Sequence, residues 1–143
     1  VKKSSNGAHI GIANQLIINE QGLKHPLYTG KKNNFNTPAF NFDEVVTLPE
    51  NGVCLASNKI NKVQGMYFKI NNNNVWGLQY HPEITYQKMI QLIKFRKDRL
   101  IETRKVFANH DQVDEHISFI EKEISISDNQ QRMIELKNWL NSF

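Results

Sequence analysis

Cysteine and long apolar runs are scarce in this sequence, and both absences limit what the chain could be. Its 143 residues include one cysteine, Cys54, so no internal disulfide can form, which fits a reducing compartment such as the cytoplasm. No stretch approaches the roughly 20 apolar residues that a membrane-spanning helix needs. The first residues, Val1 to Asn6, lack the apolar core of a signal peptide. We therefore expect a cytoplasmic protein without a membrane partner.

Acidic residues are fewer than basic ones, which leaves a formal net charge of +4. The basic residues are scattered, and the densest group, between Lys94 and Lys105, is interleaved with Asp98 and Glu102. Such a mixture on a helix is typical of a solvated face, so we expect no nucleic-acid partner. A chain of this length, with 39% hydrophobic residues, buries one modest core and forms one domain or part of one.

The most informative segment runs from Val75 to Glu83 and reads VWGLQYHPE. Its apolar residues predict a buried strand. Pro82 keeps His81 out of helical geometry, so the side chains of His81 and Glu83 leave the extended chain on the same side. A carboxylate placed there accepts the second N–H of the imidazole, which fixes its tautomer and stabilises the imidazolium. The pattern indicates the histidine–acid half of a catalytic triad; the alternative is a histidine with only a structural role.

This segment resembles the end of class I glutamine amidotransferase domains, in which a Gly-x-Gln-Phe/Tyr-His-Pro-Glu motif carries the catalytic histidine and glutamate. Other segments resemble the same family. Asp43 to Pro49 resembles its Asp-Glu-Val-x-x-Leu-Pro segment, and Val53 to Asn58 and Val63 to Gly65 resemble the strands that follow it. Gly7 to Ala13 resembles its Glu-Ile-Gly strand, His25 to Leu27 resembles its His-Pro-Leu turn, and Arg132 to Leu140 resembles the C-terminal helix of a bacterial subgroup. The resemblance covers nearly the whole chain, but only the second half of the family's domain. It implies an α/β fold, the back half of a flavodoxin-like amidotransferase domain, with a strand meander followed by C-terminal helices.

Alternation and turn residues predict strands at His9–Ile18, Val53–Ser57, Val63–Ile70 and Val75–Tyr80. The last two are joined by the run Asn71 to Asn74, which suits a hairpin tip. Between the first two strands we expect a turn at Gln21-Gly22, a polar loop from Tyr28 to Pro38, and an extended segment from Phe40 to Leu48.

After Glu83 the hydrophobic period changes to that of helices. The first helix is expected to begin after Thr85, which serves as its N-cap. The second has an N-cap at Asp111 and an apolar face made of Val113, Ile117, Ile120 and Ile124. The third has an N-cap near Asp128 and an apolar face made of Met133, Leu136 and Leu140. We expect residues 1–100 to be the C-terminal part of an amidotransferase domain and residues 101–143 a helical extension. Trp139 and Phe143 are expected to be packing residues.

The nucleophile of the family is absent from its expected setting. The family uses a cysteine in a Gly-x-Cys-x-Gly turn upstream of the segments seen here, whereas Cys54 lies between Val53 and Leu55. A nucleophile turn needs small neighbours, so we expect Cys54 to be an unreactive core residue. The chain also begins at Val1 without a methionine, which suggests the C-terminal portion of a longer domain. Two further places depart from the family: Asn41 stands where it has a histidine, and His9 where it has the strand glutamate.

The resemblance implies that a complete domain hydrolyses the side-chain amide of glutamine with a cysteine, His81 and Glu83, and transfers the ammonia. This chain alone is expected to be inactive. The alternative is a non-catalytic remnant or a basic binding module on the same scaffold. The expected partners are glutamine and a separate polypeptide that carries the N-terminal half. We expect no cofactor and no metal, because His116 does not share a helical face with His110 and Asp114.

Overall fold

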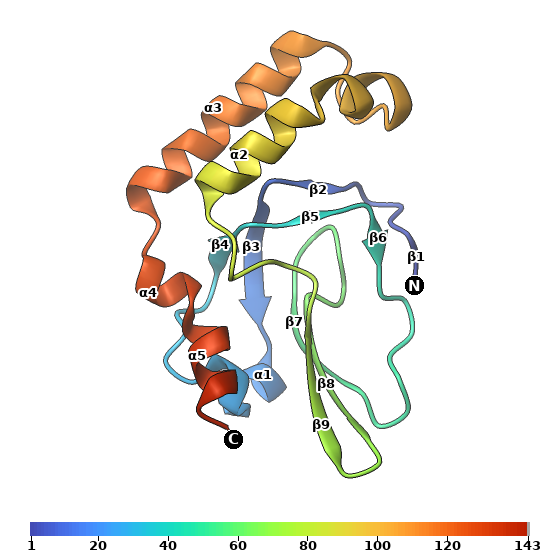
Figure 1. Cartoon of the computed structure of the whole chain (residues 1–143). Helices are drawn as coiled ribbons and strands as arrows, with labels where there is room; N and C mark the ends of the chain where they lie inside the picture. The colour runs from blue at the N-terminus through green and yellow to red at the C-terminus, as the bar shows by residue number, and fades with distance from the viewer. Residues whose placement is uncertain (143) are drawn as a thin grey trace.

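A five-stranded antiparallel sheet lies at the centre of the computed structural model, which describes residues 1–142 (Figure 1). Its strand order is β4-β3-β7-β8-β9, with bounds Phe35–Thr37, Ala13–Ile18, Val53–Ser57, Gly65–Ile70 and Asn73–Leu78 respectively. Two short antiparallel pairs lie beside it: β1 (Lys2–Lys3) with β6 (Asp43–Glu44), and β2 (His9–Ile10) with β5 (Phe40–Asn41). The predicted strand meander is therefore confirmed.

Except for the short helix α1, which lies between β3 and β4, the helices follow the sheet in sequence. The long pair, α2 (Tyr86–Phe95) and α3 (His110–Ile126), lies side by side above β2 and β5, joined through a π-helical turn at Arg99–Thr103 (Figure 1). The short helices α4 (Asn129–Arg132) and α5 (Ile134–Leu140) then lead back toward α1 (Glu20–Lys24), and α5 packs on the 3₁₀ turn Pro26–Tyr28. Among the described residues, none of the helices combines the length and the apolar character needed to cross a bilayer.

The core has two parts, one under the long helices and one against the sheet. The helical core consists of Ile10, Ile12, Tyr86, Ile90, Ile93, Leu100, Val113, Ile117 and Ile120. The sheet core consists of Ala13, Leu16, Ile18, Leu27, Tyr28, Ala39, Leu55, Ala56 and Tyr80. Residues of α3 thus share a core with residues at the start of the chain, while the proposed division at residue 100 stays a prediction.

The β8–β9 hairpin has the predicted form but not the predicted burial. The register runs from Gly65 opposite Leu78 to Ile70 opposite Asn73, and the tip residue Asn71 has the positive φ of 53° that asparagine tolerates. However, β9 is an edge strand, and Val75 to Leu78 are only half-buried. The prediction of a buried strand was wrong for this chain, because no described element pairs with the outer edge of β9.

Three predicted segments in the first half of the chain were wrong in detail. The strand predicted at 9–18 is broken at Gly11, whose φ of 83° turns the chain between β2 and β3. The expected turn at Gln21-Gly22 is instead helix α1, which the side chain of Asn19 caps by accepting a hydrogen bond from the N–H of Gly22. The expected loop from Tyr28 to Pro38 contains β4, which pairs with β3.

The helical half follows the predicted pattern with two corrections. Helix α2 begins after Thr85, whose side chain caps it as predicted. Helix α3 is capped by Asn109 instead of Asp111. The predicted third helix is divided at Met133 into α4, with its cap at Asp128 as predicted, and α5, in which Glu135 is buried and Leu140 is exposed. Trp139 is half-exposed, and Phe143 lies outside the described residues.

Candidate functional site

His81 lies just beyond the end of β9, in a segment held from both sides by backbone hydrogen bonds. The N–H of His81 donates to the carbonyl of Pro38 at 2.8 Å, and its own carbonyl accepts from the N–H of Ile84 at 3.1 Å. The second bond closes a turn around Pro82, after which Thr85 starts α2. The turn therefore fixes the backbone on which both His81 and Glu83 stand.

The two side chains meet as the sequence predicts. Nδ1 of His81 lies 2.7 Å from Oε1 of Glu83, so the carboxylate accepts the Nδ1 proton. Nε2 of His81 has no hydrogen-bond partner among the described residues, and the two side chains are 39% and 51% exposed. An imidazole that is oriented through Nδ1 and open at Nε2 is able to take a proton from a nucleophile and return it to a leaving group. The pair thus has the geometry of a base and its orienter.

Tyr80, the residue before His81, links this segment to Tyr28 and to Glu135 through its hydroxyl. Its side chain is 2% exposed, and its hydroxyl lies 2.7 Å from Oε1 of Glu135 on α5 and 3.0 Å from the hydroxyl of Tyr28. Burial is the main cause that raises the pKa of Tyr80 well above its ordinary value, and the neighbouring Tyr28 and Glu135 raise it further. Tyr80 therefore remains a neutral hydrogen-bond donor.

Helix α4 and helix α5 contribute side chains that sequence reasoning did not single out as site residues. Arg132 donates from Nη1 to the carbonyls of Pro82 and Ile84, the latter at 3.2 Å. Glu135 forms a buried ion pair with Lys31 at 3.0 Å. Their spacing of three would place both on one face of the unbroken helix that the sequence predicts, but the structure divides that helix at Met133.

Cys54 does not have the surroundings of a nucleophile. It lies within strand β7, and its Sγ is 3.3 Å from the carbonyl oxygen of Lys62 and 3.5 Å from that of Ala56. Desolvation by burial raises the pKa of the thiol, which disfavours the reactive thiolate. The structure places Cys54 in extended chain, in agreement with the expectation that it does not occupy a nucleophile turn.

The two places that depart from the family both have structural partners. Asn41 donates from Nδ2 to the carbonyl of Gln79 at 2.7 Å, which ties β5 to the segment that leads to His81. His9 is 1% exposed, and its Nε2 lies 2.8 Å from Nε2 of Gln64, so the amide donates to the imidazole. Desolvation lowers the pKa of His9 to about 4, partly offset by a hydrogen bond with the backbone of Ile12. His9 is therefore neutral at pH 7.

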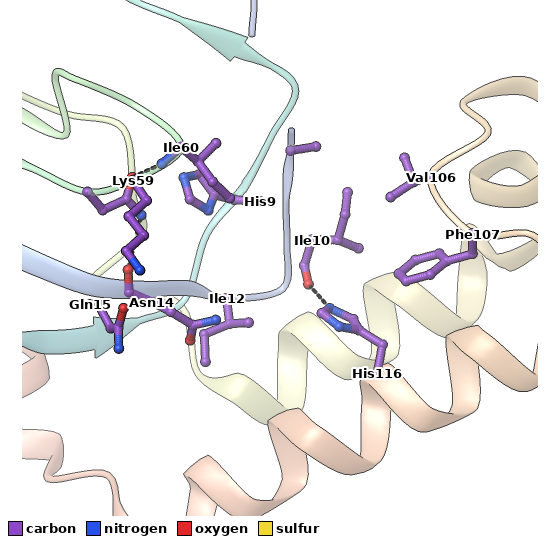
Figure 2. A pocket seen from close by; sticks show the side chains of 12 residues that line it. His9, Ile10, Ile12, Asn14, Gln15, Lys59, Ile60, Val106, Phe107 and His116 are labelled. Atoms are coloured by element: carbon purple, nitrogen blue, oxygen red, sulfur yellow. Dashed lines mark hydrogen bonds between the residues drawn. The ribbon is translucent and has the colours of Figure 1, made fainter. Parts of the chain in front are cut away.

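A cavity of about 430 Å³ lies on another part of the surface, where β2 and the following chain meet α3 (Figure 2). Its lining includes His9, Ile12 and Phe107. Figure 2 shows His116 reaching toward the carbonyl of Ile10. The distance from Nε2 of His116 to this carbonyl oxygen is 2.6 Å. Neither His81 nor Glu83 lines this cavity, so it is separate from the candidate active site.

The remaining polar residues considered from the sequence lie apart from this site. His25 is a turn residue as expected, since its Nδ1 accepts from the N–H of Leu27. His110 and Asp114 have different partners, Asp98 at 3.2 Å and Lys97 at 2.9 Å. Within the basic stretch, Arg96 and Arg104 lie over the rings of Phe40 and Phe42.

Comparisons with known proteins find two similar sequences and a similar fold. No protein-family model matches the chain. A gamma-glutamyl-L-1-hydroxyisopropylamide hydrolase from a Pseudomonas species is 34% identical over 68 residues, which is 48% of this chain and 23% of that protein. One of the subunits of the glutamine-hydrolysing GMP synthase from Methanosphaera stadtmanae is 36% identical over 70 residues, which is 49% of this chain and 34% of that relative. The match spans between about a quarter and a third of these relatives' own length.

Among solved structures, a glutamine amidotransferase from Thermotoga maritima shares the fold. The superposition covers 99% of this chain and 53% of that chain with a TM-score of 0.65, at 16% identity. Fold and sequence relatives agree with one another, and the matched structure extends well beyond the part that corresponds to this chain. The chain therefore shares its fold with this glutamine amidotransferase, and about half of its length is similar in sequence to the two relatives.

Proposed function

We propose that this chain supplies the histidine and the glutamate of a Cys-His-Glu triad that hydrolyses the side-chain amide of glutamine. The observation that supports the proposal is the 2.7 Å hydrogen bond between Nδ1 of His81 and Oε1 of Glu83, which leaves Nε2 open. The names of the two sequence relatives describe hydrolysis of a γ-glutamyl amide and of glutamine. Both compounds are amides of the γ-carboxyl group of glutamate. That chemistry fits a site with an oriented imidazole.

In this mechanism a cysteine thiol outside the described site is the nucleophile. His81 takes the thiol proton at Nε2, and the thiolate sulfur attacks the amide carbon of glutamine. The tetrahedral intermediate then collapses, the C–N bond breaks, and His81 returns the proton to the leaving ammonia. Water hydrolyses the thioester to glutamate and restores the thiol. Glu83 keeps Nδ1 protonated throughout and stabilises the imidazolium.

The nucleophile is proposed to lie on a chain segment that corresponds to the other half of the domain, supplied by a separate polypeptide. Support comes from the edge strand β9, whose residues Val75 to Leu78 are apolar or small yet only half-buried. Pairing with further strands would cover this edge and bury apolar area at about 25 cal/mol per Å² before entropic losses. Alone, the chain is proposed to be inactive.

A second candidate function is a non-catalytic role on the same scaffold. The observation that favours it is the combination of Asn41 and His9 at places where the family has a histidine and a glutamate, both now engaged in structural hydrogen bonds. Such changes would weaken glutamine binding while they leave the His81–Glu83 pair intact.

The test is an assay of glutamate release by the chain alone and together with the polypeptide encoded directly upstream. We expect no turnover by the chain alone, and turnover by the co-purified complex that falls by at least about 10³-fold in His81→Ala. The matched control Cys54→Ala should leave the rate of the complex unchanged. Turnover by the chain alone that Cys54→Ala abolishes would refute the proposal, and a stable but inactive complex would favour the non-catalytic role.

A further inference from the structure

Helices α4 and α5 carry three polar side chains that each contact a different part of the fold. Arg132 ends α4, and Glu135 and Asn138 lie three residues apart on α5, which places these two on one side of that helix. Arg132 reaches the turn after His81, Glu135 reaches Tyr80, and Asn138 donates to the carbonyls of Leu27 and Thr29 at 2.9 and 3.0 Å.

Arg132 contacts the backbone on both sides of Glu83. Its Nη1 donates to the carbonyl oxygens of Pro82 and Ile84, the residues that flank Glu83 in sequence. Nε of the same guanidinium lies 3.4 Å from Oδ1 of Asn129, which helps to fix the orientation of the group. The two N–H bonds of Nη1 have directions that the planar guanidinium fixes, whereas a lysine ammonium rotates freely about its terminal bond. Arg132 thus restrains the turn that carries the carboxylate.

Glu135 acts on the other side of the site through Tyr80, the residue before His81. Its carboxylate is buried, with side-chain exposure of 0%, and its partners are the hydroxyl of Tyr80 at 2.7 Å and Nζ of Lys31 at 3.0 Å. Lys31 also donates to the carbonyl of Gln131 at 2.7 Å. A buried carboxylate is costly unless every acceptor site is used, and a satisfied network of this kind admits few alternative arrangements. Tyr80 is therefore held in one position.

His81 and Glu83 do not hold themselves in place. Both side chains are substantially exposed, and an ion pair in such a setting contributes little against the freedom of its own side chains. The geometry of the pair must then come from the backbone of residues 80–84. From the C-terminal helices, this backbone is contacted by Arg132 directly and by Glu135 through Tyr80.

We propose that Arg132 and Glu135 are positioning residues, through which the C-terminal helical segment holds His81 and Glu83 in hydrogen-bonding geometry. The catalytic consequence rests on the function proposed above, whereas the geometric one does not. In an assembled enzyme, loss of this restraint should lower kcat on the order of 10- to 100-fold with little change in KM, because the base is misplaced while the substrate contacts remain.

The test is an NMR measurement of the Nδ1 proton of His81 in the isolated chain. It needs neither a substrate nor a nucleophile. We expect the wild type to show a protected proton on Nδ1, which His81→Gln removes and Glu83→Gln weakens. Arg132→Gln should abolish the protected proton while the chain remains folded by near-UV circular dichroism, and Arg132→Lys should restore it in part. The matched control is Lys137→Gln, the same charge change at an exposed position of α5.

A folded Arg132→Gln variant with an unchanged Nδ1 proton would overturn the proposal. If Arg132→Gln does not fold, the same NMR signal is measured in Arg132→Lys and Tyr80→Phe. Tyr80→Phe removes only the hydroxyl that Glu135 binds. An unchanged Nδ1 proton signal in both variants would contradict a positioning role. An inactive complex that retains the protected proton would count against the proposed enzymatic function and leave the positioning role intact. The two failures are thus distinguishable.

Discussion

At the scale of single residues, His9 determines part of how the fold responds to acid. Its imidazole is 1% exposed and accepts a hydrogen bond from the amide of Gln64, so only the neutral form fits the site. Desolvation lowers the pKa from 6.5 to about 4 in the folded chain. Between these values the unfolded chain binds a proton that the folded chain does not, and stability therefore falls as the pH is lowered through this window.

We expect the free energy of unfolding to decrease by up to about 3 kcal/mol between pH 7 and pH 4 on account of His9. Urea unfolding at several pH values measures the decrease. His9→Gln should show a flatter pH dependence than the wild type. The control is His110→Gln, which removes a histidine whose side chain is 61% exposed. Equal slopes in the wild type and His9→Gln would show that His9 is not responsible.

The residues of the site differ in how far the sequence could predict them. The contact between His81 and Glu83 was predictable because it depends on local geometry, two positions apart around a proline. The buried position of Glu135 was not, because it depends on Lys31, which is 104 residues away in sequence. A glutamate on a short helix is exposed by default, and only a distant partner of opposite charge reverses that expectation.

At the scale of elements, the break between β2 and β3 depends on Gly11. Its φ of 83° lies in the left-handed region, and an added Cβ would lie 2.7 Å from Cδ1 of both Ile93 and Ile120, on α2 and α3 respectively. The turn and the approach of the two helices therefore need a glycine at the same position.

Gly11→Ala should lower the free energy of unfolding by about 2 kcal/mol or more, since backbone strain and overpacking add. Gly30→Ala is a matched control, because Gly30 has a similar φ of 79° but open space around the added methyl group. We expect it to cost only about 1 kcal/mol. Chemical denaturation of both variants gives the comparison, and equal losses would show that contact with the helices contributes nothing.

Elements with strong local signals were predictable, and those that depend on tertiary contacts were not. Strand β7 has the predicted bounds, and α2 starts after the predicted cap at Thr85. Helix α1 was missed because glycine disfavours helices. It forms nonetheless, since Gly22 packs so closely against the carbonyl of Leu55 that a side chain there would collide. The break at Met133 likewise has no local breaker in the sequence.

At the scale of the whole molecule, the shared core should make the sheet and the long helices unfold together. Ile120 of α3 is fully buried in the helical core with Ile10 of β2 and with Ile12, which immediately precedes strand β3. Ile120→Ala should therefore destabilise the entire chain by about 2–5 kcal/mol. Phe119→Ala, at the neighbouring 42% exposed position, serves as the control and should have a much smaller effect.

The measurement compares two signals during unfolding. In a Trp139→Phe background, the fluorescence of Trp76 reports on strand β9, and far-UV circular dichroism reports mainly on the helices. We expect both midpoints to move together in Ile120→Ala. A shift confined to the helical signal would show that residues 101–143 unfold as a unit of their own.

The hydrogen bond from His116 to the carbonyl of Ile10 also has a consequence for the order of events during synthesis. It joins residues 106 positions apart, so the first strands emerge from the ribosome long before their covering helix exists. Closing so large a loop costs entropy before any contact repays it, which slows folding. The nascent chain therefore presents Ile10 and Ile12 to the cell until α3 is translated, and this interval is when chaperones would bind it.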